Sequence, residues 1–516
     1  MSLYNSGKAR RSLIDTVAYR ALSQLATVLS YVIMVRAMPK TDFGVYSLLY
    51  AFIPVVSTVA SLGLESVLRR YQPEYLRAGN TNGAAWLQRF VSWTRLAANI
   101  GVIGLVLLTW NYVAPIFKLT DYRFAFATFS LLILLHFQSR IFQLSLASHM
   151  LHRFSVGSIA VLSFAKLVIY GLFVLFDNLT LEKAILADTI GYGLSFLVLR
   201  IAHWRYAAPA SSPEKYRPPP EERKRLVRYG LFNNFNDAGV LLLYSTADNF
   251  FIAAFIDPIS VGIYSFYTRL NLMASQLLPL KLFDNVVQPM LFSMSHADAE
   301  RRMPQIFSFL LNVNLLWQWP VLAFVTAYHA ELVQAVFGGK FIEHSWLLPL
   351  ITGFATINII ADPVTLVAQY EEKAGIILLS KLSALYNLAA LFVLVPALGI
   401  YGAALASGSG QVLKNFFIWW HVRGRARWTN WGQSLSVSLG LWGAAVLLCY
   451  ALKRFVPVPP LAQLAMGGVV FAVTALIYIR TPALSQSDRT LLASVLRGKE
   501  VGFLQRIGLL TRPAQT

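Results

Sequence analysis

Residues 102–110 read VIGLVLLTW, and residues 441–448 read LWGAAVLL. Similar apolar runs recur from one end of the chain to the other, and none alternates with the period of a β-strand. A bilayer core about 30 Å thick needs roughly 20 apolar residues per spanning helix. Helices are favoured there because every backbone N–H and C=O must find a partner inside lipid. The runs therefore predict an all-α polytopic membrane protein.

The composition of the whole chain agrees with this class. Of its 516 residues, 56% are apolar and only 13% are charged, whereas a soluble chain usually carries about 25% charge. The single cysteine, Cys449, excludes a disulfide within the chain, and no Cys/His spacing typical of a metal site occurs in the sequence. We therefore expect neither a metal nor another cofactor.

The apolar runs predict about fourteen transmembrane helices. The first run is too long for the apolar part of a signal peptide, so we expect it to stay in the protein as an uncleaved span. The predicted spans are residues 12–34, 44–67, 90–110, 124–147, 155–176, 184–199, 229–254, 261–282, 305–326, 346–368, 374–395, 402–418, 433–452 and 461–479.

Basic residues orient these spans. With the N-terminus placed in the cytoplasm, most Lys and Arg residues outside the spans fall in cytoplasmic connections, as the positive-inside rule requires. Both termini are therefore predicted to be cytoplasmic. The formal net charge of +20 would suggest a nucleic-acid partner in a soluble protein. Here the placement of loops accounts for the charge, and we expect no nucleic acid.

One long connection divides the chain. It contains Pro218-Pro219-Pro220, followed at once by charged residues, which is typical of an exposed linker. The predicted parts are an N-lobe with spans one to six at residues 1–200, a cytoplasmic linker at 201–227, a C-lobe with spans seven to twelve at 228–420, spans thirteen and fourteen at 421–480, and a basic cytoplasmic tail at 481–516.

The two lobes share short sequence similarities at nearly one offset. Residues 43–47 read FGVYS where the second span opens, and residues 261–265 read VGIYS where the eighth span opens. The pair Leu-Ala recurs in spans six and twelve, at residues 186–187 and 405–406. Six spans return the chain to its starting side, so the repeat predicts two lobes of equal orientation, related by a pseudo-twofold axis along the membrane normal. Parallel repeats of this kind are a transporter architecture.

Several of these stretches resemble a known family. Residues 35–47 read VRAMPKTDFGVYS and residues 62–66 read LGLES, which resembles the opening of bacterial polysaccharide (Wzx-type, O-antigen and exopolysaccharide) flippases. Residues 248–252 (DNFFI) with 261–265 resemble the seventh and eighth spans of those proteins, and residues 397–406 (ALGIYGAALA) resemble the entry to the twelfth. The family lies in the multidrug/oligosaccharidyl-lipid/polysaccharide (MOP) superfamily.

The resemblance implies two six-helix lobes around a central cavity lined by spans one, two, seven and eight. It implies movement of a polyprenyl-diphosphate-linked oligosaccharide from the cytoplasmic to the periplasmic leaflet of the bacterial inner membrane, coupled to an ion gradient. The sequence has no Gly-x-x-x-x-Gly-Lys-Ser/Thr loop for ATP. The implied partners are an undecaprenyl-diphosphate-linked glycan, membrane lipid, and a polysaccharide polymerase or copolymerase in the same membrane.

Cations inside the spans are candidates for binding the diphosphate, since buried charge in a membrane usually faces a cavity or a partner. Arg20 and Arg269 lie deep on spans that the resemblance places at the cavity. Lys166 lies near mid-membrane in span five, where it either contacts cargo or pairs with an acid, while Lys281 can snorkel from a span end. The remaining cations lie one to two turns from the inner face, and they are Arg95, Arg140, Lys381 and Lys414.

Acids and amides inside the spans are candidates for ion coupling and sugar binding. Asp248, Asp362 and Asp237 can titrate or coordinate a cation, with a structural salt bridge as the alternative; Pro363 follows Asp362 and frees a backbone carbonyl. Asn233 and Asn236 precede Asp237 early in span seven, where they either bind sugar hydroxyls or only start the helix.

Three other functions fit parts of this pattern. A MATE-like multidrug extruder would favour an acidic cavity for cationic drugs, whereas the balance inside the spans is basic. A lipid II exporter shares the anionic diphosphate cargo and is not separated by charge. A membrane glycan polymerase or ligase would need a long periplasmic loop, and the longest predicted one is residues 327–345. We therefore predict a transporter and not an enzyme.

Overall fold

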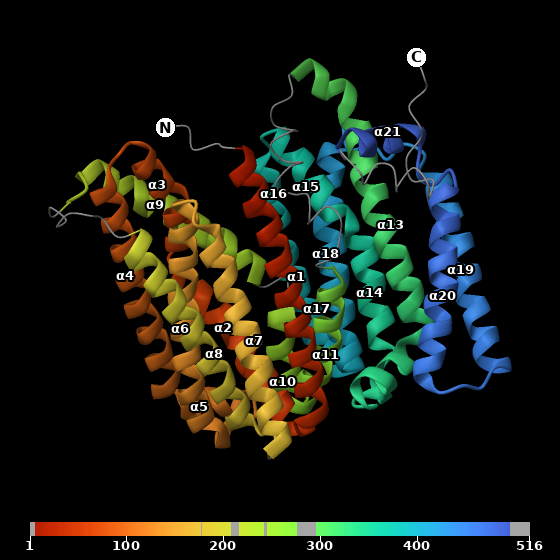
Figure 1. Ribbon diagram of the computed structural model, residues 1–516, viewed down its shortest axis with the longest axis horizontal. Coiled ribbons are helices and arrows are strands. Elements are labelled where there is room, and N and C mark those ends of the chain that lie inside the picture. Colours follow the sequence, from red (N-terminus) through yellow and green to blue (C-terminus); the bar gives the residue numbers. More distant parts are fainter. Residues whose placement is uncertain (1–5, 177, 208–215, 242–244, 276–295, 496–516) are drawn as a thin grey trace. The chain divides into compact units, whose positions relative to one another are not determined.

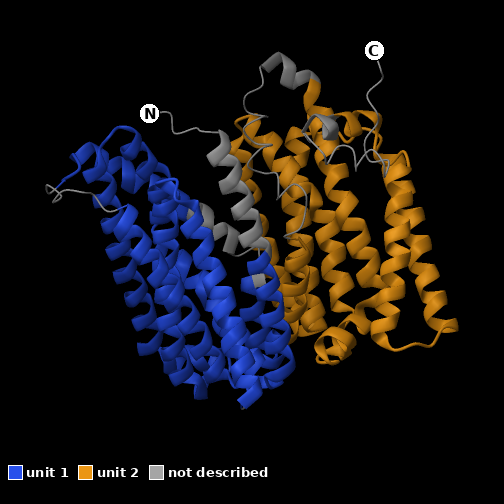
Figure 2. Cartoon of the chain, viewed as in Figure 1, with its two compact units in different colours: residues 1–262 blue, residues 263–516 orange. Residues whose placement is uncertain are grey.

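A computed structural model describes residues 6–176, 178–207, 216–241, 245–275 and 296–495. Within these ranges it describes the side chains of all residues except 6–21, 235–245, 296–301 and 491–495. The described residues are helical apart from short turns, and none of them forms a strand. The chain divides into two compact units, Met1–Gly262 and Ile263–Thr516 (Figure 2). The predicted all-α class is confirmed.

The first unit is built from long helices joined by short turns (Figure 1). Two of them, α7 and α8, pack along each other, and α7 also packs along α1. The helices are α1 (Ser6–Ala37), α2 (Lys40–Ser61), α3 (Leu64–Arg77), α4 (Thr81–Leu108), α5 (Trp110–Ile116), α6 (Arg123–Ser148), α7 (His152–Phe176), α8 (Leu181–Tyr206), α9 (Pro220–Leu241) and α10 (Ser245–Phe255), with α11 (Pro258–Ser275) running across the boundary.

The second unit is organised around one long helix, α13, which contributes to two apolar clusters. One cluster joins α13 to α15 and α18, and the other joins it to α19 and α20. The helices are α13 (His296–Phe337), α14 (Leu347–Ile357), α15 (Ala361–Tyr370), α16 (Ala374–Ser380), α17 (Ser383–Leu398), α18 (Ile400–Val422), α19 (Trp431–Phe455), α20 (Pro460–Arg480) and α21 (Gln486–Val495).

Ten helical segments of the described chain are long and apolar enough to cross a membrane. The four remaining predicted spans correspond to α1, to α9 with α10, to α11 and to α18. Three of these four are spans one, seven and eight, which the sequence resemblance placed at a polar cavity. The described apolar part of α1, Leu22–Ala37, is shorter than a full span.

The second span ends earlier than predicted. Residues 44–67 were expected to form one helix, but α2 stops at Ser61, because Leu62 and Gly63 adopt left-handed backbone angles with φ of 48° and 67°. The turn redirects the chain into α3, whose apolar face packs on α4 and α6. A Cβ on Gly63 would lie 1.8 Å from the carbonyl oxygen of Gly230 on α9, so only glycine fits this crossing.

The predicted linker is shorter than residues 201–227. Helix α8 continues to Tyr206, and α9 begins at Pro220. Proline is favoured at the first position of a helix, because the backbone N–H there would have no acceptor within the helix. The contact boundary between the units falls after Gly262, because α9 and α10 pack against α2 and α3. On this seam Arg225 pairs with Glu74 at 3.2 Å.

Two later spans are also interrupted. Predicted span ten, residues 346–368, is α14 and α15 joined by a 3₁₀ turn at Asn358–Ile360. Predicted span eleven, residues 374–395, is α16 and α17, separated at residues 381–382. Both segments, Leu347–Tyr370 and Ala374–Leu398, are long and apolar enough to cross a membrane, as predicted. The breaks inside them were not predicted, because an apolar composition is the same on either side of a turn.

The repeated motifs meet in space. Gly44 opens α2 and Gly262 lies in α11, at matching positions of FGVYS and VGIYS. A Cβ on Gly262 would lie 2.9 Å from the Cα of Gly44, and a Cβ on Gly44 would lie 2.2 Å from the carbonyl oxygen of Pro258. The two backbones therefore touch at the residues that the sequence comparison pairs.

Candidate functional site

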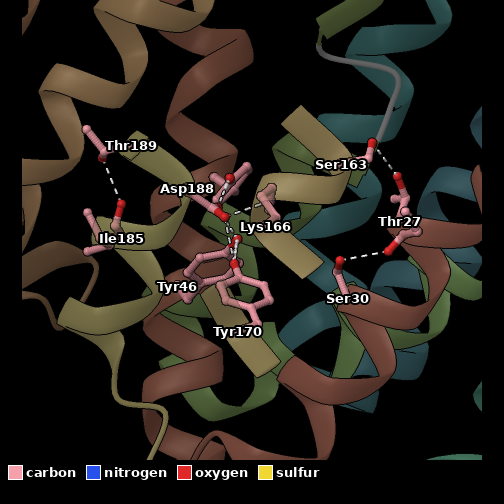
Figure 3. A network of polar contacts seen from close by, with 11 residues as sticks. Thr27, Ser30, Tyr46, Ser163, Lys166, Tyr170, Ile185, Asp188 and Thr189 are labelled. Atoms are coloured by element: carbon pink, nitrogen blue, oxygen red, sulfur yellow. Dashed lines mark hydrogen bonds and ion pairs between the residues drawn. The ribbon is translucent and has the colours of Figure 1, made fainter. Parts of the chain in front are cut away.

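A carboxylate with several donors lies inside the first unit, between α2, α7 and α8 (Figure 3). Asp188 of α8 has a fully buried side chain. Its Oδ2 accepts hydrogen bonds from the hydroxyls of Tyr46, at 2.5 Å, and of Tyr50 on α2, and its Oδ1 accepts one from Tyr170 on α7, at 2.6 Å. We call these residues, together with Lys166, the Asp188 cluster.

Lys166 supplies the positive charge of the Asp188 cluster. Its Nζ lies 2.8 Å from Asp188 Oδ1, and its side chain is 21% exposed. The stem of Lys166 crosses α8 at Gly191, where an added Cβ would lie 3.2 Å from Lys166 Cγ. Because Asp188 and Gly191 are three residues apart, they share one face of α8. The sequence thus places an acid and a gap for a basic stem side by side.

Hydroxyl groups continue from this cluster toward α1. The hydroxyl of Ser163, one turn before Lys166 on α7, lies 3.1 Å from that of Thr27 on α1 (Figure 3). Thr27 and Ser30 also donate to backbone carbonyls of their own helix. The row adds polar character to the α1–α7 contact, whereas most of α7 is apolar.

A second group of charges lies where α3 begins, and we call it the Glu65 cluster. Arg95 of α4 is completely buried and pairs with Glu65 at 3.1 Å. It also donates to the hydroxyls of Ser57 and Ser61 near the end of α2. Arg140 of α6 reaches the other oxygen of Glu65 with its Nε at 3.7 Å. These contacts hold the break between α2 and α3 against α4 and α6.

The exposure of Arg140 sets it apart from Arg95. Its side chain is 46% exposed, although Arg140 lies well inside the membrane-spanning helix α6. A charge that faces hydrocarbon is costly. Its terminal guanidinium nitrogens make no hydrogen bond to another described residue, so they are available to a ligand. A planar guanidinium matches two oxygens of a phosphate at once. Arg95, by contrast, is completely buried with both terminal nitrogens bound to protein groups, and it is suited to positioning Glu65.

The other predicted residues of the first unit are placed only in part. Asn233 of α9 donates to the carbonyl of Tyr229 in its own helix at 2.8 Å, and Asp248 of α10 is fully buried. Arg20 lies on α1, and Asn236 and Asp237 lie on α9, but their side chains are outside the described residues.

The second unit brings together two predicted residues. Asp362 at the start of α15 lies within electrostatic reach of Lys414 on α18, and Asn415 beside it donates to Asn358 at 2.8 Å. Arg269 on α11 is exposed, and Lys381 at the end of α16 is half-buried. Lys281 lies outside the described residues. No three His, Cys, Asp or Glu side chains within the described ranges come together to hold a metal ion.

Sequence reasoning singled out Lys166 as a residue that either contacts cargo or pairs with an acid, and the structure confirms the pair. It did not select Asp188, Tyr50 or Tyr170 as site residues. One signal was present: Lys166, near the middle of span five, and Asp188, in the first half of span six, carry opposite charges on consecutive spans. The tyrosines gave no signal, because tyrosine is common in this chain and only the rotation of each helix shows which rings face the acid.

Comparison with solved structures identifies the fold. The chain is similar in fold to a lipid II flippase MurJ in an inward closed conformation, with a TM-score of 0.66 and 12% identity over 90% of this chain and 99% of that chain. It is also similar to a multidrug resistance MATE family transporter of the MOP superfamily in an inward-facing conformation, with a TM-score of 0.61 and 13% identity over 80% and 98% of the two chains. The chain therefore shares the fold of these two membrane transporters.

The family follows from the sequence. The model of the polysaccharide biosynthesis protein family matches residues 13–295, more than half of the chain. The chain belongs to that family, as its motifs predicted. No curated protein sequence matches it.

Proposed function

We propose that this protein is a flippase for a polyprenyl-diphosphate-linked oligosaccharide. In this proposal it moves complete repeat units from the cytoplasmic to the periplasmic leaflet of the bacterial inner membrane, with both termini in the cytoplasm, for cell-surface polysaccharide synthesis. The membership of the family and the MOP-superfamily fold support transport in polysaccharide biosynthesis. The cargo follows from chemistry: a diphosphate and a hydrated glycan need a polar, cationic path, while the lipid tail can stay in hydrocarbon.

The observation that carries the proposal is the half-exposed Arg140 on α6, a helix of mostly apolar residues. A diphosphate offers pairs of oxygens at the spacing that a guanidinium binds. Arg140 meets Glu65 through Nε, at 3.7 Å, and its side chain is 46% exposed, so its two terminal nitrogens remain for a ligand. In this proposal Arg95 contributes by fixing Glu65 and not by touching the cargo.

The remaining predicted residues keep their proposed roles. Arg20, Arg269, Lys381 and Lys414 are further cations for the diphosphate, and Asn233 and Asn236 are contacts for sugar hydroxyls. Asp248, Asp237 and Asp362 are proposed for ion coupling, and Asp362 lies within electrostatic reach of Lys414. A polymerase or copolymerase in the same membrane would take up the flipped unit.

A leaflet-resolved assay tests the function. The gene is deleted, and the lipid-linked oligosaccharide is probed on spheroplasts with a membrane-impermeant reagent that modifies sugars. We expect complete units that are protected from the reagent, and rescue by the wild-type gene. Units that are accessible but unpolymerised would contradict the proposal and favour a polymerase or ligase. Accumulation of lipid II alone would move the assignment to a lipid II exporter.

A further inference from the structure

We propose that the second unit carries a binding site for the headgroup of a zwitterionic phospholipid, one that joins a phosphate to a primary ammonium. The site lies between the ends of α15 and α18, where α15, α16 and α18 pack against one another (Figure 1). It uses none of the residues proposed for the cargo or for ion coupling.

A cavity of about 580 Å³ opens at this end of the second unit. That volume lies within the roughly 300–1,000 Å³ of a small-ligand pocket. Two turns and the helix ends before them form it: residues 371–373 join α15 to α16, and residues 423–430 join α18 to α19. The lining comes from residues 370–373 and from four residues between 421 and 425. The cavity is therefore shaped by two chain reversals that face each other.

The cavity lies at the depth of lipid headgroups. Leu347–Tyr370 and Ala374–Leu398 are both long and apolar enough to span a membrane, so the turn between them reaches the membrane surface. The second turn is flanked by Trp420 and Trp431, whose side chains are 50% and 61% exposed. Exposed tryptophans are typical of the interface between hydrocarbon and water. The nearest ligand for this cavity is therefore the headgroup of a surrounding lipid.

One set of lining groups offers donors for a phosphate. Lys373 and Arg425 share the carboxylate of Glu371, at 2.6 Å and 3.4 Å, so two positive charges face one negative charge. Arg423 lies between two lining residues, with its guanidinium carbon 3.9 Å from the centre of the Trp420 ring. No acceptor among the described residues binds the N–H groups of Arg423. A guanidinium held by an indole keeps its donors for two phosphate oxygens.

The same cavity offers acceptors for an ammonium. Glu372 is exposed, and its carboxylate meets no donor in the part of the chain that the structure describes. Nδ1 of His421 donates to the carbonyl of Phe417 at 2.8 Å, so Nε2 of the neutral ring carries the lone pair and accepts. The last carbonyls of a helix carry partial negative charge, and α15 and α18 both end here. The carbonyl of His421 already accepts from the ammonium of Lys373 at 2.8 Å.

The balance of charge selects the class of lipid. The charged lining residues are the acids Glu371 and Glu372 and the bases Lys373 and Arg425. An anionic headgroup without an amine would satisfy the bases and leave Glu372 beside a second negative charge. A choline headgroup carries both charges, but its quaternary nitrogen has no N–H to donate. A phosphate with a primary ammonium meets both sets of groups, so phosphoethanolamine is the headgroup that the lining fits.

Native mass spectrometry of the purified full chain tests the site. The probes are phosphatidylethanolamine, phosphatidylcholine and phosphatidylglycerol with identical acyl chains, added in competition so that the mass of each adduct identifies the lipid. We expect the ethanolamine lipid to bind about fivefold more tightly than the other two, the upper end of what one exposed ion pair contributes. Equal binding of the three lipids, or a preference for the glycerol lipid, would overturn the inference.

Two substitutions separate the two sets of groups. Glu372→Gln should remove the preference for the ethanolamine lipid, and Arg423→Ala should weaken all three lipids by a similar factor, because all three carry the phosphate. Both side chains are exposed, as are those of the controls Glu182→Gln and Arg454→Ala, which should keep the wild-type order. A preference that survives in Glu372→Gln would contradict the ammonium contact. Displacement of the lipid by free phosphoethanolamine at equal concentration would overturn the assignment to a lipid.

Discussion

The two charged clusters of the first unit differ in which member, the acid or the base, is buried. In the Asp188 cluster the acid is completely buried and its lysine is 21% exposed, whereas in the Glu65 cluster Arg95 is completely buried and the acid is 22% exposed. The buried member is the one with several protein partners, and the exposed member has few. The comparison teaches that depth in the membrane does not decide which charge can meet a ligand. The buried partner, which several protein groups contact, is fixed, and the more exposed partner is available.

The largest expected effect comes from breaking the buried side of the Glu65 cluster. Arg95→Ala should cost about 3–5 kcal/mol in the free energy of unfolding, because it removes one partner of a buried pair and two hydroxyl contacts at the end of α2. Denaturant unfolding in mixed micelles measures it. Arg89→Ala, an exposed arginine on the same helix, is the matched control and should be nearly neutral. Equal effects of the two variants would show that Arg95 does not fix the cluster.

A smaller loss in the free energy of unfolding is expected when one hydrogen-bond donor to Asp188 is removed. Tyr46→Phe keeps the ring and removes one hydrogen bond to a buried carboxylate, which is worth about 1.5–3 kcal/mol. The same unfolding measurement applies, with Tyr112→Phe on α5 as a control, since Tyr112 is highly exposed. If Tyr46→Phe left stability unchanged, Lys166 and not the tyrosines would be holding the acid, and the contrast between the clusters would fail.

The smallest effect on stability is expected at the exposed side of the Glu65 cluster. Arg140→Ala should change the free energy of unfolding by less than about 1 kcal/mol, since a half-exposed pair at 3.7 Å contributes little. Transport should nevertheless fall at least about tenfold, the worth of one charge-assisted contact. The leaflet assay, with Arg140→Lys and Arg200→Ala as controls, separates the two quantities. Unchanged transport at normal protein levels would remove Arg140 from the site.

Much of the fold was predictable because membrane spans are set by the length and composition of apolar runs. Predicted span four at residues 124–147 and α6 at Arg123–Ser148 differ by one residue at each end. The breaks at Leu62-Gly63 and at Asn358–Ile360 were not predicted, because they depend on backbone angles and on close approach to another helix. Gly63 stands in the quoted motif LGLES, but its neighbour across the contact, Gly230, is far away in sequence.

The candidate site was predictable as a list of charges and not as a set of pairs. Arg95, Arg140 and Lys166 were all identified as cations within spans, and the structure separates them by how each is held. Their partners lie on other helices, and pairing depends on the rotation of each helix about its axis. A local motif carries no information on that rotation, so the sequence could not show that Arg95 is enclosed while Arg140 is open.

The contact between Gly44 and Gly262 bears on how such a chain can evolve. In a gene that arose by duplication, most positions of the two copies diverge independently, because they face different neighbours. A position that contacts its own counterpart is different, because a side chain gained in one copy would clash with the backbone of the other. A substitution that recombination carried into both copies would place two side chains in the same contact. Here an added Cβ already approaches the opposite backbone to 2.9 Å. If the two halves arose by duplication, the two glycines are therefore expected to stay glycine in both copies while the residues around them diverge.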